Sequence, residues 1–245
     1  MKIETCFSPL LYHLYHNSDA NVVVIDVLRA TSAICAAFAA GAEKIIPVGT
    51  IDEAKQMKDA GYILAAERNG IVLDFADFGN SPFNFTPERV KGKTIAYSTT
   101  NGTQAIQMAK NAKRIIIGAF TNLSTVVTFL ENDLSDVVIL CSGWKGRINL
   151  EDTICAGALA QKLIDSGKFS TICDATNAAM DLWKTANPDL HKYIEKASHY
   201  HRLRKMILDD IIEYCHTLNC VKVLPMFENE VILDFYAKYA KNNNI

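Results

Sequence analysis

The sequence predicts an α/β protein, a three-layer α/β/α arrangement around a mixed, largely parallel sheet. Short apolar runs rich in β-branched residues alternate with Ala-rich segments of helical length, and a polar loop bearing Gly, Ser or Thr joins each run to the next segment. Strands that are apolar on both faces and alternate with helices are typical of a parallel sheet covered on both sides. The 245 residues suffice for a sizeable core, so we expect 1–245 to be a single domain, undivided or made of two closely packed lobes.

The first repeating unit begins with the apolar strand 22–25, which leads into the polar loop 26–32. An Ala-rich helix follows and runs to Ala40. Gly41 is well suited to end this helix, because glycine accepts the left-handed backbone conformation that follows many helices.

The other predicted elements continue the same alternation of apolar strands and helices. They are the strand 44–48, the strand 94–97, the helix 104–111, the strand 114–117, the strand 137–140, the helix 151–164, one or two helices within 189–218, and two late strands at 221–224 and 231–235.

Charge and cysteine content exclude several classes of protein. The formal net charge of −2 supplies no overall basic field, so we expect neither nucleic acid nor an anionic membrane as partner. The first residues do not read as a signal peptide, and no apolar run is long enough to span a bilayer, so a cytoplasmic protein is expected. The seven cysteines form no C-x-x-C pair and are expected to be free thiols. The oligomeric state stays open, a homo-oligomer included.

Three predicted strand-end loops carry many polar groups, and ligands of open α/β sheets bind beyond the carboxyl ends of strands. In the first loop, Asp26 directly follows a strand, where it could ligate a metal or attack a phosphoryl group, and Arg29 offers a charged fork for an anion. Thr31 and Ser32 stand at a helix start, which favours anions. The alternative is that a hydroxyl caps the helix and Asp26 pairs with Arg29.

The second loop, 98–103, brings hydroxyl and amide groups to the start of a helix, where backbone N–H groups can converge on an oxyanion. The groups are those of Thr99, Thr100, Asn101, Gly102 and Thr103. An ordinary capped turn is the alternative. The loop is not a P-loop, because no Gly-Lys-Ser/Thr follows.

The third loop places Cys141 and Arg147 at the spacing used by cysteine-dependent phosphatases, although its glycines do not match theirs. Glu151 and Asp152 follow at a predicted helix start, where they could bind a divalent cation or merely favour the helix dipole. Glu67 follows a further apolar run, and with Arg68 it forms either a site or a solvated surface pair.

Taken together, these segments resemble the 2-phosphosulfolactate phosphatase (ComB-like) family. The matching pieces occur in family order over most of the chain, with a thinner C-terminal match at Ser198-His199 and Arg202-Leu203. The main ones are 25–31, 67–70, 78–82 (which contains Asn80), 99–103, 141–147 and 150–158.

The resemblance implies a three-layer α/β/α, Mg²⁺-dependent phosphatase that cleaves (2R)-2-phospho-3-sulfolactate to sulfolactate and phosphate, on the route to coenzyme M. Such a small polyanionic phosphoester needs several fixed cations, which separate loops can supply. Mg²⁺ prefers oxygen ligands. We therefore expect Asp26 and Arg29 to be catalytic. The expected metal ligands are Asp26, Glu67, Glu151 and Asp152, and the expected substrate-binding residues are Arg68, Asn80, Thr99, Thr100, Asn101, Gly102, Thr103 and Arg147.

Two departures from the family pattern concern the substrate. Asn69 stands where glycine is usual, and Tyr200-His201 replaces the usual Gly-Arg, which removes a cation from a sulfonate or carboxylate contact. A related 2-phospho-2-hydroxycarboxylate is therefore an alternative substrate. Two further readings stay open: a metal-independent cysteine phosphatase that uses Cys141 and Arg147, and a binding protein for a small polyanion without turnover. The sequence gives no role for His199, for which a surface or core position is the ordinary expectation.

Overall fold

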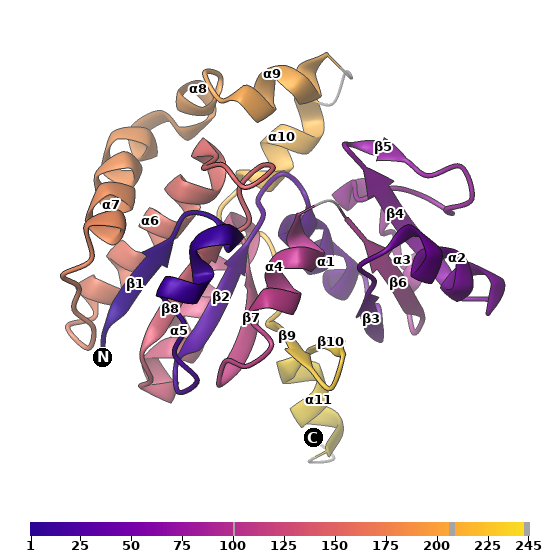
Figure 1. The fold of residues 1–245 in the computed structure, drawn as a ribbon, viewed down its shortest axis with the longest axis horizontal. Helices are drawn as coiled ribbons and strands as arrows, with labels where there is room; N and C mark the ends of the chain where they lie inside the picture. The colour runs from indigo at the N-terminus through magenta and orange to yellow at the C-terminus, as the bar shows by residue number, and fades with distance from the viewer. Residues whose placement is uncertain (100, 206–208, 243–245) are drawn as a thin grey trace.

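Two groups of parallel strands, joined by a hairpin, form one sheet in the computed structural model, which describes residues 1–99, 101–205 and 209–242 (Figure 1). The order across the sheet is β1-β8-β2-β7-β9-β10-β3-β6-β4-β5. The strands are β1 (Ile3–Cys6), β2 (Asn21–Ile25), β3 (Lys44–Pro47), β4 (Ile63–Arg68), β5 (Ile71–Val72), β6 (Thr94–Ser98), β7 (Arg114–Gly118), β8 (Val137–Cys141), β9 (Pro225–Glu228) and β10 (Val231–Asp234).

The pairings explain the mixed character of the sheet. Strands β1, β8, β2 and β7 are parallel, as are β3, β6 and β4. The β9–β10 hairpin pairs antiparallel with β7 on one side and with β3 on the other, and β5 pairs antiparallel with β4. Figure 1 shows this hairpin between the two strand groups.

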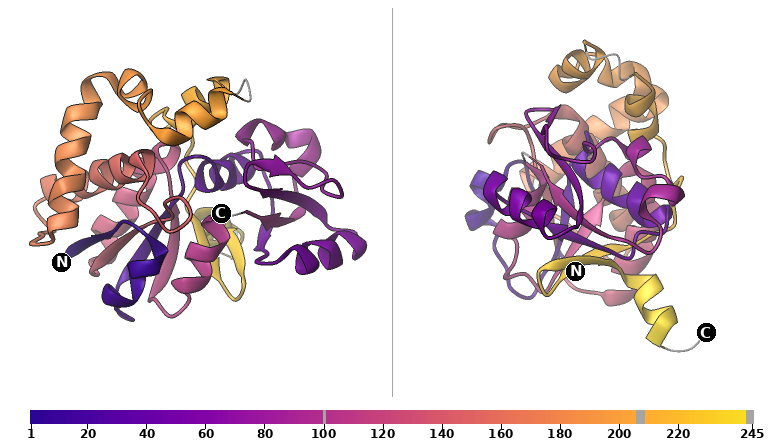
Figure 2. Two further views of the ribbon diagram at one scale, coloured as in Figure 1. Left: turned by 45° about the horizontal axis from the view of Figure 1, so that its top comes forward. Right: turned by 90° about the vertical axis from the view of Figure 1, so that its right-hand side faces the viewer.

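Helices cover both faces of the sheet. They are α1 (Ala30–Ala39), α2 (Ile51–Asp59), α3 (Pro87–Val90), α4 (Gly102–Met108), α5 (Leu123–Asp133), α6 (Leu150–Asp165), α7 (Asp174–Ala186), α8 (Leu190–Ile194), α9 (Ser198–Arg204), α10 (Asp209–Cys215) and α11 (Phe235–Asn242). Short 3₁₀ turns lie at Pro9–Leu14 (η1), Pro82–Asn84 (η2), Phe120–Asn122 (η3) and Asn187–Asp189 (η4). Figure 2 shows α8, α9 and α10 crossing from α7 toward the second strand group.

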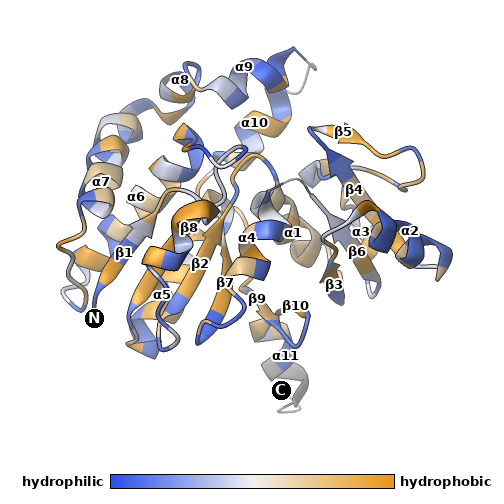
Figure 3. Cartoon of the chain, viewed as in Figure 1, coloured by the Kyte–Doolittle hydropathy of each residue, from blue (hydrophilic) through white to orange (hydrophobic). Residues whose placement is uncertain are grey.

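Strand β2 shows why the sheet needs cover on both sides. All five of its residues are buried, and successive side chains of a strand point to opposite faces. Val23 and Ile25 pack in the core beneath α5, α6 and α7, whereas Val22 and Val24 pack in the core beneath α1 and α4. The central strands are accordingly among the most hydrophobic parts of the chain (Figure 3). The predicted three-layer α/β/α class is confirmed.

Helices α6 and α7 approach each other closely at Gly157. A Cβ atom there would lie only 1.9 Å from the carbonyl oxygen of Ala179 on α7. Because this approach fixes α6 against α7, it helps to position the first turn of α6, which carries Glu151 and Asp152.

Two predictions for the C-terminal part are wrong. Three short helices, α8, α9 and α10, occupy 189–218 within the described residues, where one or two were expected. Residues 221–224 form no strand, because β9 begins at Pro225 and pairs with β10 through a two-residue turn. Both turn residues, Asn229 and Glu230, have positive φ, as the tightest hairpins require. Over the described residues, no helix is long and apolar enough to cross a membrane.

Candidate active site

One pocket gathers predicted residues from three strand ends. Asp26 after β2, Glu67 in β4 and Thr99 after β6 line it, and Arg29, Asn80 and Asn101 join them. Asn69, Gly70, Leu28 and, from the C-terminal half, Trp144, His199, Arg202 and Leu203 complete the wall. Segments far apart in the sequence therefore meet where the sheet ends.

Hydrogen bonds fix the loop after β2 to the first turn of α1. The Thr31 hydroxyl donates to the backbone carbonyl of Asp26 at 2.9 Å and accepts the Asp26 N–H at 3.1 Å. The Ser32 hydroxyl donates to the carbonyl of Val27 at 2.9 Å. The Asp26 carboxylate accepts the N–H of Ala30 at 3.3 Å. The hydroxyls thus hold the loop, and Asp26 caps the helix while it lines the pocket.

Asp152 joins two of the site loops. One of its carboxylate oxygens accepts the N–H of Val27 at 2.8 Å, and the other accepts the N–H of Gly143 at 3.0 Å. The side chain is fully buried, and burial together with the nearby Asp26 and Glu151 raises its pKa well above the usual value. Asp152 is absent from the pocket wall, and both of its oxygens are engaged with backbone N–H groups.

Glu151, its neighbour on α6, holds a histidine from α9. One Glu151 oxygen lies 2.9 Å from Nδ1 of His199 and accepts from the Asn149 amide at 3.1 Å. Its other oxygen is buried without a hydrogen-bond partner. Burial alone would raise the pKa of Glu151. The hydrogen bond with His199 and the charge of His199 are the main opposing contributions, and the net result is a lowered pKa. His199, with no role assigned from sequence, lies on the pocket wall.

Four buried carboxyls lie on the pocket wall or near it: Asp26 and Glu67 line the pocket, whereas Glu151 and Asp152 do not. Asp26, Glu67, Glu151 and Asp152 are all buried. The pKa of Asp26 is raised to about 7, mainly by burial and less by the charges of Glu67 and Glu151. The hydrogen bond from the Ala30 N–H and the charge of Arg29 partly offset this rise. Such a cluster is unfavourable unless a cation lies among the carboxylates.

The loop after β6 packs tightly against the loop that carries Asp26. A Cβ atom on Gly102 would lie 2.6 Å from Cβ of Ala30 and 3.1 Å from a carboxylate oxygen of Asp26. The Thr103 hydroxyl donates to the carbonyl of Thr99 at 3.0 Å, so it holds the loop. Thr100 lies outside the described residues.

The loop after β8 does not form a phosphate cradle. Cys141 is fully buried, and burial raises the pKa of its thiol well above the usual value. The N–H of Ser142 donates to Ile25, that of Gly143 to Asp152, and that of Trp144 to Arg147. Backbone donors that a phosphate would need are thus already used.

Two predicted arginines are absent from the pocket wall. The Arg68 guanidinium donates to the carbonyls of Glu67 and Gly49 and to the hydroxyl of Ser98, at 2.7, 3.2 and 2.9 Å. Arg147 is exposed on the turn that follows Trp144. Their roles in substrate binding stay predictions.

Arg202 lies on the pocket wall, although the sequence analysis assigned it no role. Its guanidinium carbon is 3.5 Å from the centre of the Trp144 ring, and one of its terminal nitrogens is buried without a hydrogen-bond partner. The thin C-terminal family match contained it. No local spacing connects α9 with the strand-end loops, and this is why it was missed.

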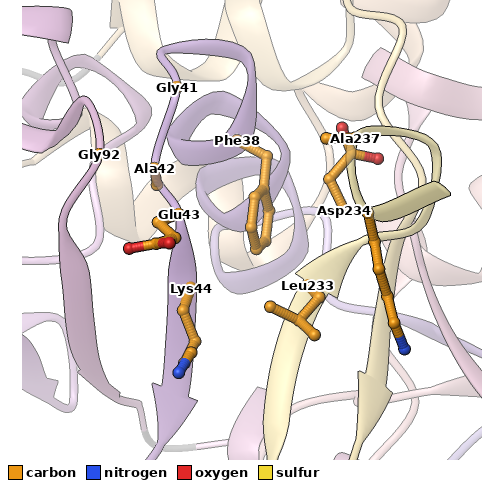
Figure 4. Close-up of a pocket in the computed structure, with 10 residues that line it drawn as sticks. Phe38, Gly41, Ala42, Glu43, Lys44, Gly92, Leu233, Asp234 and Ala237 are labelled. Atoms are coloured by element: carbon orange, nitrogen blue, oxygen red, sulfur yellow. The ribbon is translucent and has the colours of Figure 1, made fainter. Parts of the chain in front are cut away.

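A larger pocket lies elsewhere, between β3 and β10 near the end of α1 (Figure 4). Lys44 and Leu233 line it together with Phe38 and Asp234. None of the predicted site residues lines it, so the smaller pocket at the strand ends is the candidate active site.

Comparison with known proteins identifies the family of the chain. Residues 6–230 match the family described as 2-phosphosulpholactate phosphatase. Proteins named probable 2-phosphosulfolactate phosphatase are similar over most of their length: that of Clostridium novyi is 39% identical (93% of this chain, 97% of the relative), that of Clostridium acetobutylicum 38% (88% and 92%), and that of Caldanaerobacter subterraneus subsp. tengcongensis 35% (87% and 90%). The chain therefore belongs to the 2-phosphosulpholactate phosphatase family, whose members are phosphoric monoester hydrolases.

Proposed function

We propose that this chain is a Mg²⁺-dependent phosphatase that hydrolyses 2-phospho-3-sulfolactate, or a related 2-phospho-2-hydroxycarboxylate, to the hydroxy acid and phosphate. The observation that carries the proposal is the pocket itself, where buried carboxyls from two strand ends face Arg29 and Arg202. Family membership and the names of the relatives support the substrate. The proposal extends to the coenzyme M route and to a cytoplasmic location, for which seven free thiols are suitable.

The residues present fit a magnesium ion. The carboxylates of Asp26 and Glu67 would hold it from opposite loops of the pocket, and Mg²⁺ needs only one or two carboxylates beside phosphate and water. Within the described residues no group of three or more His, Cys, Asp or Glu side chains is placed to hold a metal, so the proposed ion depends on these two carboxylates and not on the full expected set of four. The raised pKa of Asp26 supports such an ion, because a cation would restore its charged form. When bound, the ion would neutralise charge on the phosphoryl group.

The chain's own groups bind and orient the substrate. Arg29 is buried beside Asp26 and supplies fixed positive charge for phosphoryl oxygens. Asn80 is buried with an unpartnered amide oxygen, and it can accept a hydrogen bond from the substrate or from a bound water. Asp26 remains either the attacking carboxylate or a metal ligand. Asp152 and the hydroxyls of Thr31 and Ser32 keep these groups in place.

Two observations argue against the cysteine mechanism. It needs a thiolate, but burial raises the pKa of the Cys141 thiol well above its usual value. It also needs free backbone donors, and the N–H groups of Ser142, Gly143 and Trp144 already donate within the protein. We therefore expect Cys141→Ser to remain substantially active.

Phosphate release tests the proposal against both alternatives. The purified protein is assayed on 2-phospho-3-sulfolactate, 2-phospholactate and 2-phosphoglycerate, with Mg²⁺ and with EDTA. We expect turnover that EDTA abolishes and Mg²⁺ restores. Full activity in EDTA, together with an inactive Cys141→Ser protein, would establish the cysteine mechanism instead. Tight binding without release of phosphate from any ester would establish a binding protein.

A further inference from the structure

Arg202 is held in an unusual position for a cationic side chain. It extends from α9, and its guanidinium lies against the face of the Trp144 indole, 3.5 Å from the ring centre. The ring of His199, one turn earlier on α9, lies 5.4 Å from the same indole. Trp144 thus supports both side chains, and all three line the pocket.

One terminal nitrogen of this guanidinium is buried and has no hydrogen-bond partner. A buried donor left unpaired costs free energy, and more when it is charged. Within the described parts of the chain, no carboxylate forms an ion pair with Arg202. Burial lowers its pKa, although Glu151 and, less strongly, Glu67 and Asp26 favour its charged form. The protein therefore keeps an unpaired cationic donor on a side chain that lines the pocket.

Arg202 reaches the pocket from a different part of the chain than the proposed phosphoryl-binding groups. Arg29 and Asp26 lie together on the loop after β2, whereas Arg202 reaches the pocket from α9, on the side of Trp144 and His199. Stacking on an indole leaves a guanidinium free to donate only in its own plane. Two donors in one plane match two oxygens of a carboxylate or a sulfonate.

We propose that Arg202, held against Trp144, binds the second anionic group of the substrate, the carboxylate or sulfonate that a phosphoester of this class carries beside its phosphate. Arg202 is then a specificity-determining residue. This inference rests on the proposed function, because it takes the same pocket to hold the same phosphoester. It accounts for the unpartnered donor of Arg202. It also makes this one side chain responsible for selecting substrates that carry a second anionic group.

Equilibrium binding of two reaction products tests the inference without turnover. Calorimetry measures the affinity of Arg202→Gln for 3-sulfolactate and for inorganic phosphate, each in the presence of Mg²⁺. Losing a buried charged partner costs about 2 kcal/mol or more, so we expect 3-sulfolactate to bind about 30-fold more weakly or worse, with phosphate affinity unchanged. Two competitors identify the group that Arg202 binds: lactate, which lacks the sulfonate, and 2-hydroxyethanesulfonate, which lacks the carboxylate. The competitor that carries the group bound by Arg202 should lose its effect in the Arg202→Gln variant.

Arg204→Gln is the matched control. It removes the same charge from the same helix, but Arg204 is exposed and pairs with Asp209 at 3.2 Å. We expect it to bind both products as the unaltered protein does. Arg202→Lys, which keeps the stem and charge but not the fork, is expected to lose part of the 3-sulfolactate affinity, and it serves as the test if the Gln variant does not fold.

Equal weakening of both products, or no weakening of either, would overturn the inference. Equal weakening would place Arg202 at the phosphoryl group or in the packing of the pocket. The proposed function fails by a different observation, namely the absence of phosphate release from the unaltered protein, so the two failures are distinguishable.

Discussion

Substitution of Gly102 by alanine tests whether close packing of two helix starts positions the candidate catalytic carboxylate. The added Cβ would lie 2.6 Å from Cβ of Ala30, and ordinary carbon contacts are about 3.5–4.0 Å. Neither atom can rotate away, because each is attached directly to a helix backbone. The starts of α1 and α4 must therefore separate by about 1 Å.

This separation has two expected consequences. Overpacking of a buried contact costs about 1–3 kcal/mol. We therefore expect the free energy of unfolding, measured in urea, to fall by this amount. The same Cβ lies 3.1 Å from a carboxylate oxygen of Asp26, so the carboxylate must also shift. A displacement of about 1 Å at a catalytic group can lower the rate about 100-fold. Phosphate release under saturating Mg²⁺ measures this second effect.

A double-mutant cycle identifies the cause. Ala30→Gly removes the nearest atom, so the double variant should recover at least about 0.5 kcal/mol relative to the sum of the single variants. Turnover should recover only in part, because the contact with Asp26 remains. Gly49→Ala is the control: Gly49 is exposed, and its added Cβ would meet only Glu53, at 3.6 Å, so a change within about 0.5 kcal/mol is expected. If Gly102→Ala matched the unaltered protein in stability and turnover, the reasoning would be refuted.

Three other substitutions test the site and the fold. Asp26→Asn should lower turnover by orders of magnitude at saturating Mg²⁺ while urea unfolding stays cooperative, and near-normal turnover would remove Asp26 from the mechanism. Arg147→Ala should cost about 1 kcal/mol or less in kcat/KM because Arg147 is exposed, and a much larger loss would restore its expected role in binding substrate. His216 is buried, and burial lowers its pKa from 6.5 to about 4, so only the unfolded chain takes up the proton between these values. The free energy of unfolding should therefore fall as pH falls from 6.5 to 4, by about 3 kcal/mol more in the unaltered protein than in His216→Phe. If urea unfolding gave the same pH profile for both proteins, this prediction would be contradicted.

The strands near the site could be predicted because their residue pattern has one interpretation. An apolar run such as Val22–Ile25 of β2, followed by polar residues and an Ala-rich segment, is consistent with a strand buried on both faces. Strand β10 was also predicted, as 231–235, but β9 lacked such a pattern and a strand was expected at 221–224 instead. The turn of the hairpin β9–β10 is Asn229-Glu230, and glutamate at a position with positive φ is not the Asn-Gly or Asp-Gly pair by which such turns are recognised.

Part of the candidate site was predictable because its residues lie at or near strand ends. Asp26, Glu67 and Thr99 could be placed together because the ends of strands meet at one side of a sheet. Arg202 and His199 reach the same pocket from α9, and their position depends on packing against Trp144 rather than on any local pattern. Arg68 shows the opposite case, since its charge suggested an anion site and the structure engages it with the carbonyls of Glu67 and Gly49.

The first turn of α6 shows why neighbouring acids of similar sequence context can differ in role. Successive residues of a helix point about 100° apart, so Glu151 faces His199 on α9 while Asp152 faces the loops after β2 and β8. A sequence presents both only as acids at a helix start. The difference arises from their partners: Asp152 has both oxygens engaged by backbone N–H groups, whereas Glu151 keeps one buried oxygen unpartnered. Of the two, Glu151 is therefore the one with a carboxylate oxygen left to ligate a cation, while Asp152 holds the loop that carries Asp26.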